Sequence, residues 1–238
     1  MGSARLSYAG GALGRGKNIE LGMIRIDGTV VESGEEFSFG KALGSVSEAD
    51  GFTKQRVFLN SEVSMGLGGG LCQVSTILFQ SVLHAGLPIT ERRNHTYSVS
   101  YYDTGLDATF ADPGPDLKFV NDTAYPITIR GRTENSVAIF EIYGVSDGRQ
   151  VTIGEVGVSQ IVNISPTKYV YVTERDKDTP ECVNNPQIGY TAQVPYDVLY
   201  ETGVIKKEVF TSTYQPLQRV CHVVVQSIAS TTPSSTGL

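Results

Sequence analysis

The segment MGLGGGLCQVSTILFQSVLHAGLP, residues 65–88, holds the one stretch of this chain whose apolar pattern is convincingly helical. Gly86 suits the position just after a last helical turn, and Pro88 prevents continuation. The sequence therefore predicts one helix that starts near Cys72 and needs strands from elsewhere to cover it. Its apolar stripe consists of residues at spacings of three and four: Leu71, Val74, Leu78, Val82 and Ala85.

The remainder of the chain has the pattern of short strands separated by Asn, Asp, Gly and Pro. Residues 19–63 are strand-like, and Asp27-Gly28 predicts a hairpin turn between MIRI and TVV. We therefore expect an α+β fold, with a mixed N-terminal unit in which one central helix, starting at the cysteine, packs on antiparallel strands. Further strands are predicted at TYSVSYY, DATF, DLKFVN, YPITIRGRT and VAIFEIYG, and then at VTIGEVG, KYVYVTER, GYTAQVPYDVLYETGVIKKEVFTSTYQP and CHVVVQ.

The composition changes along the chain and suggests four parts. Residues 1–17 look like an expression scar and a loose linker, and residues 229–238 look like a disordered tail. Between them we place a catalytic domain over residues 18–145 and a β-rich part over residues 146–228. The β-rich part could also pack as an extension of the same domain.

The overall composition excludes several classes of function. A chain of 238 residues with 40% apolar content is long enough for a hydrophobic core. Its net charge of −6 argues against nucleic acid as a partner, because phosphate binding needs a concentrated basic face. No apolar run is long enough to span a membrane, so we expect contact with a membrane only through a segment outside this sequence. We expect no metal, because the histidines and cysteines lack zinc spacing and no acidic loop has the calcium pattern, and we expect no cofactor.

Three cysteines leave at least one thiol unpaired. Cys182 and Cys221 both lie in the C-terminal part and could form a disulfide, but the sequence leaves this pairing open. If they pair, the compartment is oxidising and Cys72 is the free thiol.

Cys72 stands where a helix start would activate it. Unpaired amides and the helix macrodipole favour the thiolate there, which is the nucleophilic form of cysteine. Gly69 and Gly70 allow a tight entry turn and a close substrate approach, and nearby amides can face a developing oxyanion. A phosphate-binding loop would need Gly-Lys-Ser/Thr after the glycines, whereas Leu71-Cys72-Gln73 follows here. An inert, buried Cys72 remains the alternative.

A nucleophilic cysteine needs a base, and the chain has three histidines. His84 is twelve residues along the same helix, about 18 Å up its axis, which is too far to serve. His222 lies in a strand-like run near the C-terminus. His95, in ERRNHTYSVSYY, is the expected base, because the next strand could return alongside the helix toward Cys72.

Other polar residues near these two are candidates for supporting roles. Asp107 could orient the imidazole as a third catalytic residue, although Asp103 and Asp112 are equally polar and close in sequence. We expect the substrate-binding and oxyanion group to come from the glycine turn, the first helical turns and the arginine pair. Its candidates are Gly69, Gly70, Gln73, Ser75, Thr76, Arg92 and Arg93; an arginine could hold a carboxylate by a forked pair of hydrogen bonds.

The string GLGGGLCQVSTILFQSVLHAGLPITERRNHTYSVSYYDTGLDATF resembles the VanW domain family. The hallmarks of that family are G-G-G-x-C-Q-x-S-T, then E-R-x-x-H and G-x-D-A-T. The resemblance covers residues 18–144, and the closing TSTYQP is also similar to the end of such proteins. One departure is Ile77, where many members have a second threonine.

The resemblance implies a cell-envelope protein of mainly Gram-positive bacteria, outside the cell and membrane-anchored in full length. It implies an L,D-transpeptidase in which Cys72 forms a thioester with one peptidoglycan tetrapeptide stem and an amine of another stem resolves it. The partners would be donor and acceptor stems, and we expect a monomer. Two alternatives stay open: a thiol peptidase or carboxypeptidase on the same substrate, and a non-catalytic module that binds peptidoglycan or a partner.

Overall fold

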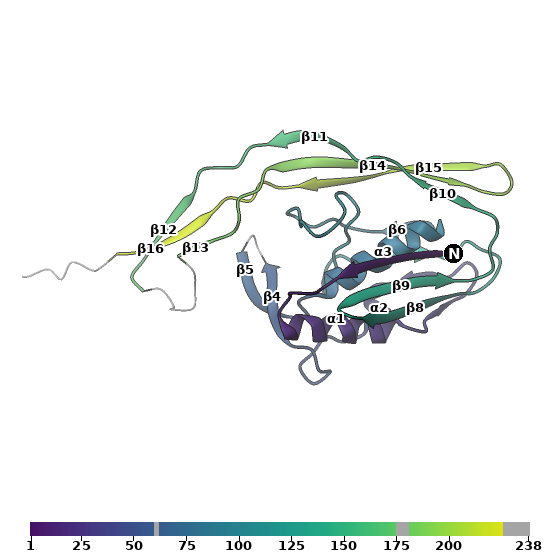
Figure 1. Ribbon diagram of the computed structural model, residues 1–238, viewed down its shortest axis with the longest axis horizontal. Coiled ribbons are helices and arrows are strands. Elements are labelled where there is room, and N and C mark those ends of the chain that lie inside the picture. Colours follow the sequence, from purple (N-terminus) through teal and green to yellow (C-terminus); the bar gives the residue numbers. More distant parts are fainter. Residues whose placement is uncertain (60–61, 175–180, 226–238) are drawn as a thin grey trace, which may run out of the picture.

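The computed structural model describes residues 1–59, 62–174 and 181–225 and has a mixed α+β architecture (Figure 1). Its described helices are α1 (Leu13–Ile26), α2 (Phe39–Leu43) and α3 (Leu71–Ala85), and most strand pairs are antiparallel. The expected α+β class is confirmed at this level. The strands are β1 (Gly2–Ser7), β2 (Val30–Val31), β3 (Glu36–Ser38), β4 (Lys54–Leu59), β5 (Glu62–Leu67), β6 (Ile89–Glu91), β7 (Lys118–Val120), β8 (Ile127–Glu134), β9 (Val137–Tyr143), β10 (Gln150–Ile153), β11 (Gly157–Val162), β12 (Lys168–Val172), β13 (Cys182–Val183), β14 (Gly189–Leu199), β15 (Ile205–Tyr214) and β16 (Val220–Val224).

The predicted helix is α3, and its ends are those expected from the sequence. Gly70 precedes it with φ 118°, and Gly86 follows it with φ 74°, both in the region that favours glycine. Most of α3 is buried on every side, not only along one stripe. A helix that is buried all round is the centre of a core, so the rest of the chain is arranged about α3.

One side of α3 is covered by a sheet with the order β1-β9-β8-β2. β1 pairs antiparallel with β9 over its whole length. It also lies directly on α3, because a Cβ added to Gly2 would be 2.3 Å from the Ala85 amide nitrogen. The interpretation of residues 1–17 as a loose linker is therefore wrong: residues 2–7 are a sheet strand and residues 13–17 open α1.

Residues 19–26 form part of α1, so the prediction of strands there is wrong. Ile19, Met23 and Ile26 are buried and lie on one helical face against the sheet and α3. The alternation within MIRI suggested a strand. The three buried side chains, however, are separated by four and three residues, which is the spacing of one face of a helix. Asp27 ends α1 instead of opening a hairpin, and its carboxylate accepts a hydrogen bond from the Gly131 amide at 2.9 Å.

The long β14–β15 hairpin covers the opposite side of α3 (Figure 1). The Tyr196 hydroxyl donates to the Leu83 carbonyl at 2.7 Å, and the Phe79 and Phe210 rings meet edge to face at 5.5 Å. Side chains from the hairpin share one apolar core with the helices and the first sheet. The C-terminal part thus packs as an extension of the N-terminal unit, which was one of the two arrangements left open.

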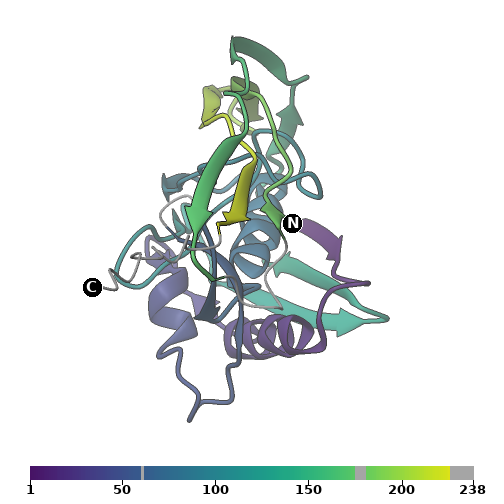
Figure 2. The ribbon, with the colours of Figure 1, turned by 90° about the vertical axis from the view of Figure 1, so that its left-hand side faces the viewer.

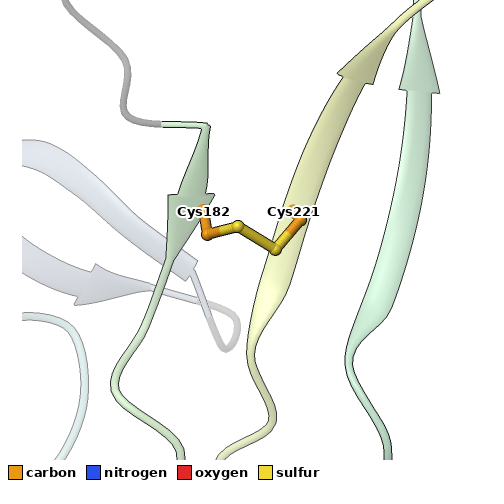
Figure 3. The surroundings of a disulfide bond; sticks show 2 residues. All are labelled: Cys182 and Cys221. Carbon is orange, nitrogen blue, oxygen red and sulfur yellow. A yellow bond between two sulfur atoms is a disulfide. The ribbon is translucent and has the colours of Figure 1, made fainter.

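The small sheet β12-β16-β13 lies at the far end of the hairpin, away from α3 (Figure 1), and faces the viewer in Figure 2. β12 runs parallel to β16, while β13 is antiparallel to it. Cys182 and Cys221 face each other across β13 and β16 and form a disulfide (Figure 3). The pairing left open by the sequence is therefore present, and Cys72 is a free thiol.

In the parts of the chain that the structure describes, every helix is too short or too polar to cross a membrane. The tail expected at residues 229–238 lies outside the described residues.

Candidate functional site

Cys72 is the second residue of α3 and is half-buried. Its position puts its own amide among the first four of the helix, which have no carbonyl partner within the helix. The neighbouring amides are already used, because Leu71 donates to the Gly68 carbonyl at 3.0 Å and Gln73 donates to the Gly70 carbonyl at 2.9 Å. The Cys72 sulfur lies 3.5 Å from the Phe110 carbonyl oxygen. The thiol is thus at the helix start, as expected, and faces the loop that contains Phe110.

The glycines before Cys72 are buried against the protein itself. A Cβ added to Gly70 would be 3.0 Å from Cγ1 of Ile19 and 3.2 Å from the Arg15 carbonyl oxygen. A Cβ on Gly69 would be 2.7 Å from Cβ of Gln55 on β4. The expectation that these glycines open a path for substrate is corrected: their missing side chains let α1 and β4 pack against the start of α3.

His95 and Asp107 lie together beside this helix start. Nδ1 of His95 is 2.5 Å from Oδ2 of Asp107, and the His95 amide donates to the same oxygen at 2.6 Å. Because Nδ1 is engaged by the carboxylate, the other side of the ring is left to interact with Cys72, and this interaction lowers the pKa of the thiol and raises the pKa of the imidazole. The three residues chosen as catalytic from the sequence therefore form one continuous thiol–imidazole–carboxylate chain.

The charges in this chain support one another. Burial alone raises the pKa of the Cys72 thiol, but the hydrogen bond and positive charge of His95, a backbone hydrogen bond at Phe110 and the charge of Arg15 lower it by more. Burial alone lowers the pKa of His95, but its hydrogen bonds to Asp107 and Cys72 raise that pKa to about 9. Opposite shifts in two bonded groups favour a thiolate–imidazolium pair, the reactive form of a catalytic cysteine.

Asp107 is buried, with 2% of its side chain exposed, and is surrounded by donors. Its Oδ1 accepts a hydrogen bond from the Tyr214 hydroxyl at 2.5 Å and pairs with Arg92 at 3.3 Å. Burial raises the pKa of Asp107, but the hydrogen bond and charge of His95 and the Tyr214 hydroxyl lower it by more, so the carboxylate stays ionised. Tyr214 belongs to β15, so the C-terminal hairpin contributes directly to the site.

Arg92 was expected to hold a substrate carboxylate, and the structure gives it another place. Only 6% of its side chain is exposed, and its three guanidinium nitrogens bond within the protein. Nε donates to the Asp107 carbonyl at 2.6 Å, and Nη1 donates to the Ser212 hydroxyl at 2.9 Å. Arg92 therefore neutralises and positions Asp107 instead of facing substrate. Arg93 is exposed, and its carbonyl accepts from the Thr109 amide at 2.8 Å.

Ser75 and Thr76 were expected in the substrate-binding group, but both are fully buried and hold the Asp107 loop onto α3. The Ala108 carbonyl accepts from the Ser75 hydroxyl at 2.6 Å and from the Thr76 hydroxyl at 3.1 Å. The Ala108 amide donates back to the Thr76 oxygen at 3.0 Å. These bonds set the distance between the loop with Asp107 and the helix with Cys72.

Removing the Thr76 hydroxyl is expected to destabilise the fold. Thr76→Val keeps the side-chain shape but leaves the buried Ala108 amide without its acceptor, so we expect a loss of about 1–3 kcal/mol in the free energy of unfolding. Urea denaturation measures this loss. Thr90→Val, the same change at an exposed site on β6, is the control and should cost about 0.5 kcal/mol or less. Equal effects of the two substitutions would contradict the role given to Thr76.

The segments TYSVSYY and DATF are loops, so the strands predicted there are wrong. Their polar groups bond to separate elements instead of to one neighbouring strand. The Thr96 carbonyl accepts from the Gln215 amide at 2.7 Å, and the Ser98 hydroxyl bonds to the Tyr190 hydroxyl on β14 at 2.7 Å. Together with the α3 bonds, these contacts hold a folded loop whose shape the local sequence pattern does not encode.

Gln73 was expected near the oxyanion, and its side chain instead bridges α3 to the N-terminal elements. Its Nε2 donates to the Ser7 carbonyl and its Oε1 accepts from Arg15, both at 3.0 Å. Arg15 also donates to the Tyr101 hydroxyl at 3.0 Å. Beyond Tyr101, the Tyr102 ring packs 5.3 Å from the His95 ring. Burial and nearby charges raise the pKa of Tyr102 well above its usual value, so its phenol is neutral.

The local sequence pattern did not indicate four further residues of the site: Arg15, Tyr101, Tyr102 and Tyr214. Arg15 was assigned to a linker, although Leu13 to Ile26 has the helical spacing that would have placed it on α1. A signal for Tyr214 was present, because TSTYQP was already noted as similar to the end of family members.

The fold and site define an α+β protein with a cysteine, a histidine and an aspartate in one hydrogen-bonded chain at a helix start. The chain belongs to the VanW-like family, because the family described as "VanW like protein" matches residues 14–143. The resemblance found from the motifs is thereby confirmed.

Two curated relatives are similar to this chain. One is the "Uncharacterized protein YoaR" of Bacillus subtilis, 40% identical over 129 residues, which are 54% of this chain and 43% of that protein. The other is the "Vancomycin B-type resistance protein VanW" of Enterococcus faecalis, 31% identical over 111 residues, which are 44% of this chain and 40% of that protein. The chain thus spans less than half the length of either relative in these matches. No solved structure matches it.

Proposed function

We propose that this protein is a cysteine-dependent L,D-transpeptidase that cross-links peptidoglycan stem peptides through a thioester on Cys72. The observation that carries the proposal is the half-buried Cys72–His95 pair, whose two pKa values are shifted in opposite directions and whose imidazole is oriented by Asp107. A thiol with a purely structural role does not need an imidazolium partner that is oriented by an ionised carboxylate, whereas a nucleophilic thiolate does.

The first half of the reaction forms the thioester. The Cys72 thiolate attacks the carbonyl that joins an L-centre to the terminal D-residue of a tetrapeptide stem. The oxyanion of the tetrahedral intermediate is stabilised by the Cys72 amide at the start of α3. The C–N bond then breaks, and His95 gives its proton to the departing amine.

The second half transfers the acyl group. An amine of a second stem attacks the thioester carbonyl, loses its proton to His95, and expels the Cys72 thiolate. The products are a new amide cross-link, the free D-amino acid and the regenerated thiolate–imidazolium pair. Water in place of the amine would instead give a shortened stem, which is the reaction of a carboxypeptidase.

Two further observations support an envelope location. The Cys182–Cys221 disulfide is typical of an oxidising compartment outside the cytoplasm. The name of the Enterococcus faecalis relative connects that protein with vancomycin resistance. We therefore propose that this protein acts at the outer face of the cell envelope, as a monomer on donor and acceptor stems.

The test is incubation of the protein with disaccharide–tetrapeptide muropeptides, followed by mass spectrometry of both products and protein. Cross-linked dimers are expected, together with an adduct on Cys72 that hydroxylamine removes. Cys72→Ala is the control for the assignment of the adduct. Shortened monomers without dimers would show that water, and not a second stem, resolves the thioester, so the protein would be a hydrolase and not a transpeptidase. Wild-type protein with no product, no adduct and slow alkylation of Cys72 below pH 7 would favour a non-catalytic binding module.

A further inference from the structure

Arg15 is a cation beside the reactive thiol, and the described part of the chain contains no acidic side chain in an ion pair with it. Arg92, by contrast, is neutralised within the protein by Asp107. Arg15 is half-buried, in the first turn of α1, and its recorded side-chain hydrogen bonds go to two neutral groups through Nη2. An arginine that is held in place but not neutralised can still take an anion.

Packing between α1 and α3 fixes the position of Arg15. The start of α1 packs closely on the start of α3, since a Cβ at Gly70 would be only 3.2 Å from the Arg15 carbonyl oxygen. Gln73, next to Cys72 in sequence, fixes the guanidinium through its Oε1 at 3.0 Å. On the other side, the guanidinium carbon lies 5.8 Å from the centre of the Tyr101 ring. Stacking and hydrogen bonds together orient the planar group.

The surroundings of Arg15 are open to a ligand. Tyr101 is 49% exposed, and its hydrogen bond with Arg15 lies at the surface. The Tyr101 and Tyr102 rings meet edge to face at 4.5 Å, and Tyr102 continues to His95. A row of aromatic rings therefore runs from the half-buried guanidinium to the catalytic imidazole. The charge of Arg15 also acts on the Cys72 thiolate, which shows that the two groups are within electrostatic reach.

We propose that Arg15, held between Gln73 and Tyr101 beside Cys72, binds the free carboxylate of the D-residue that leaves when the thioester forms. The identity of this ligand rests on the proposed function. The carboxylate carbon of that residue is two bonds from the nitrogen of the scissile amide, so a carboxylate site must lie next to the nucleophile. A guanidinium matches a carboxylate with two parallel hydrogen bonds. On Arg15 the carboxylate would take the place of the exposed Tyr101 hydroxyl at Nη2, and Nε or Nη1 would donate the second hydrogen bond. This subsite would select stems that end in a free carboxylate over longer or amidated ones.

The first test does not depend on turnover. Cys72 is alkylated with iodoacetate, which has a carboxylate, and with iodoacetamide, its neutral counterpart, and the ratio of the two rates is measured at pH 7. Dividing the rates cancels any change in the fraction of thiolate. Arg15→Gln is expected to lower the iodoacetate-to-iodoacetamide ratio about five- to tenfold, because the variant loses a charge-assisted hydrogen bond to the iodoacetate carboxylate.

Lys17→Gln is the matched control, because it removes one positive charge from an exposed position on the same helix. Its ratio should stay close to that of the wild-type protein. An unchanged ratio in Arg15→Gln, or an equal fall in both variants, would overturn the subsite.

The second test uses donor stems that end in a carboxylate or in a carboxamide. Wild-type protein should acylate the carboxylate donor about tenfold or more faster in kcat/KM, and Arg15→Gln should lose this preference. A preference that survives Arg15→Gln refutes the subsite. If the wild-type protein acylates with neither donor, the proposed function fails, while the alkylation ratio still decides whether Arg15 binds a carboxylate.

Discussion

Asp107→Asn is expected to reduce acyl transfer about 10³-fold and to destabilise the fold by about 3–5 kcal/mol. The carboxylate accepts four hydrogen bonds, from the His95 amide, His95 Nδ1, the Tyr214 hydroxyl and Arg92. In an asparagine one of the two oxygens is replaced by an NH₂ group, which is a donor and cannot accept the hydrogen bonds that this oxygen accepts. The His95 ring would lose its orientation, and the buried Arg92 guanidinium would lose its counter-ion.

Activity on muropeptides and urea denaturation measure the two effects separately. Asp103→Asn is the control, because it is the same change at an exposed position of the same loop. Tyr214→Phe removes a single hydrogen bond and should cost less in stability, about 1–2 kcal/mol. An Asp107→Asn protein as stable and active as Asp103→Asn would mean that Asp107 does not hold the site together.

His95→Gln is expected to slow alkylation of Cys72 by iodoacetamide at pH 6.5 by roughly 30- to 100-fold. The pKa of the wild-type thiol is lowered mainly by His95 against the opposing effect of burial. Without the imidazolium, that pKa returns to its ordinary range or above, so only a small fraction of thiolate remains at pH 6.5. His84→Gln is the control: it removes an exposed histidine from α3, the helix that contains Cys72, and should leave the alkylation rate unchanged. Equal rates for His95→Gln and His84→Gln would show that no ion pair exists.

The direction of each pKa shift also determines the pH profile of acyl transfer. As pH falls through the lowered pKa of Cys72, the thiolate is protonated and the rate falls. As pH rises through about 9, His95 loses the proton that the leaving amine needs, and the rate falls again. The profile should therefore be bell-shaped with an alkaline limb near pH 9. Alkylation of wild-type Cys72 should not fall on that limb, because it needs only the thiolate.

The local sequence predicted those elements in which short-range preferences and burial agree. For α3, apolar spacing, the glycine after the last turn and the following proline all indicate the same helix. β8, β9 and the β14–β15 hairpin are likewise strands, as their alternating patterns predict. α1 was missed because a short alternation in MIRI was given more weight than the buried face formed by Ile19, Met23 and Ile26.

The roles of the motif residues needed the fold. Chemistry alone suggested that Ser75, Thr76 and Arg92 touch substrate, since hydroxyl and guanidinium groups serve that purpose in many enzymes. All three are instead turned inward to bind the Asp107 loop. A sequence pattern indicates which residue types occur together, but it does not indicate on which side of a loop each side chain faces.

What the sequence alone determined is local: a cysteine at the start of a helix, a histidine in reach of it, and the family to which both belong. Such features depend on neighbouring residues, capping and the charge of a helix end, all of which are encoded within a few turns. What only the tertiary structure decided is which distant groups meet at that cysteine. β15 brings Tyr214 to Asp107 across 107 positions of the chain, and α1 brings Arg15 to Gln73 across 58. These contacts depend on how the shared apolar core stacks its helices and its hairpin, and no local pattern records that packing.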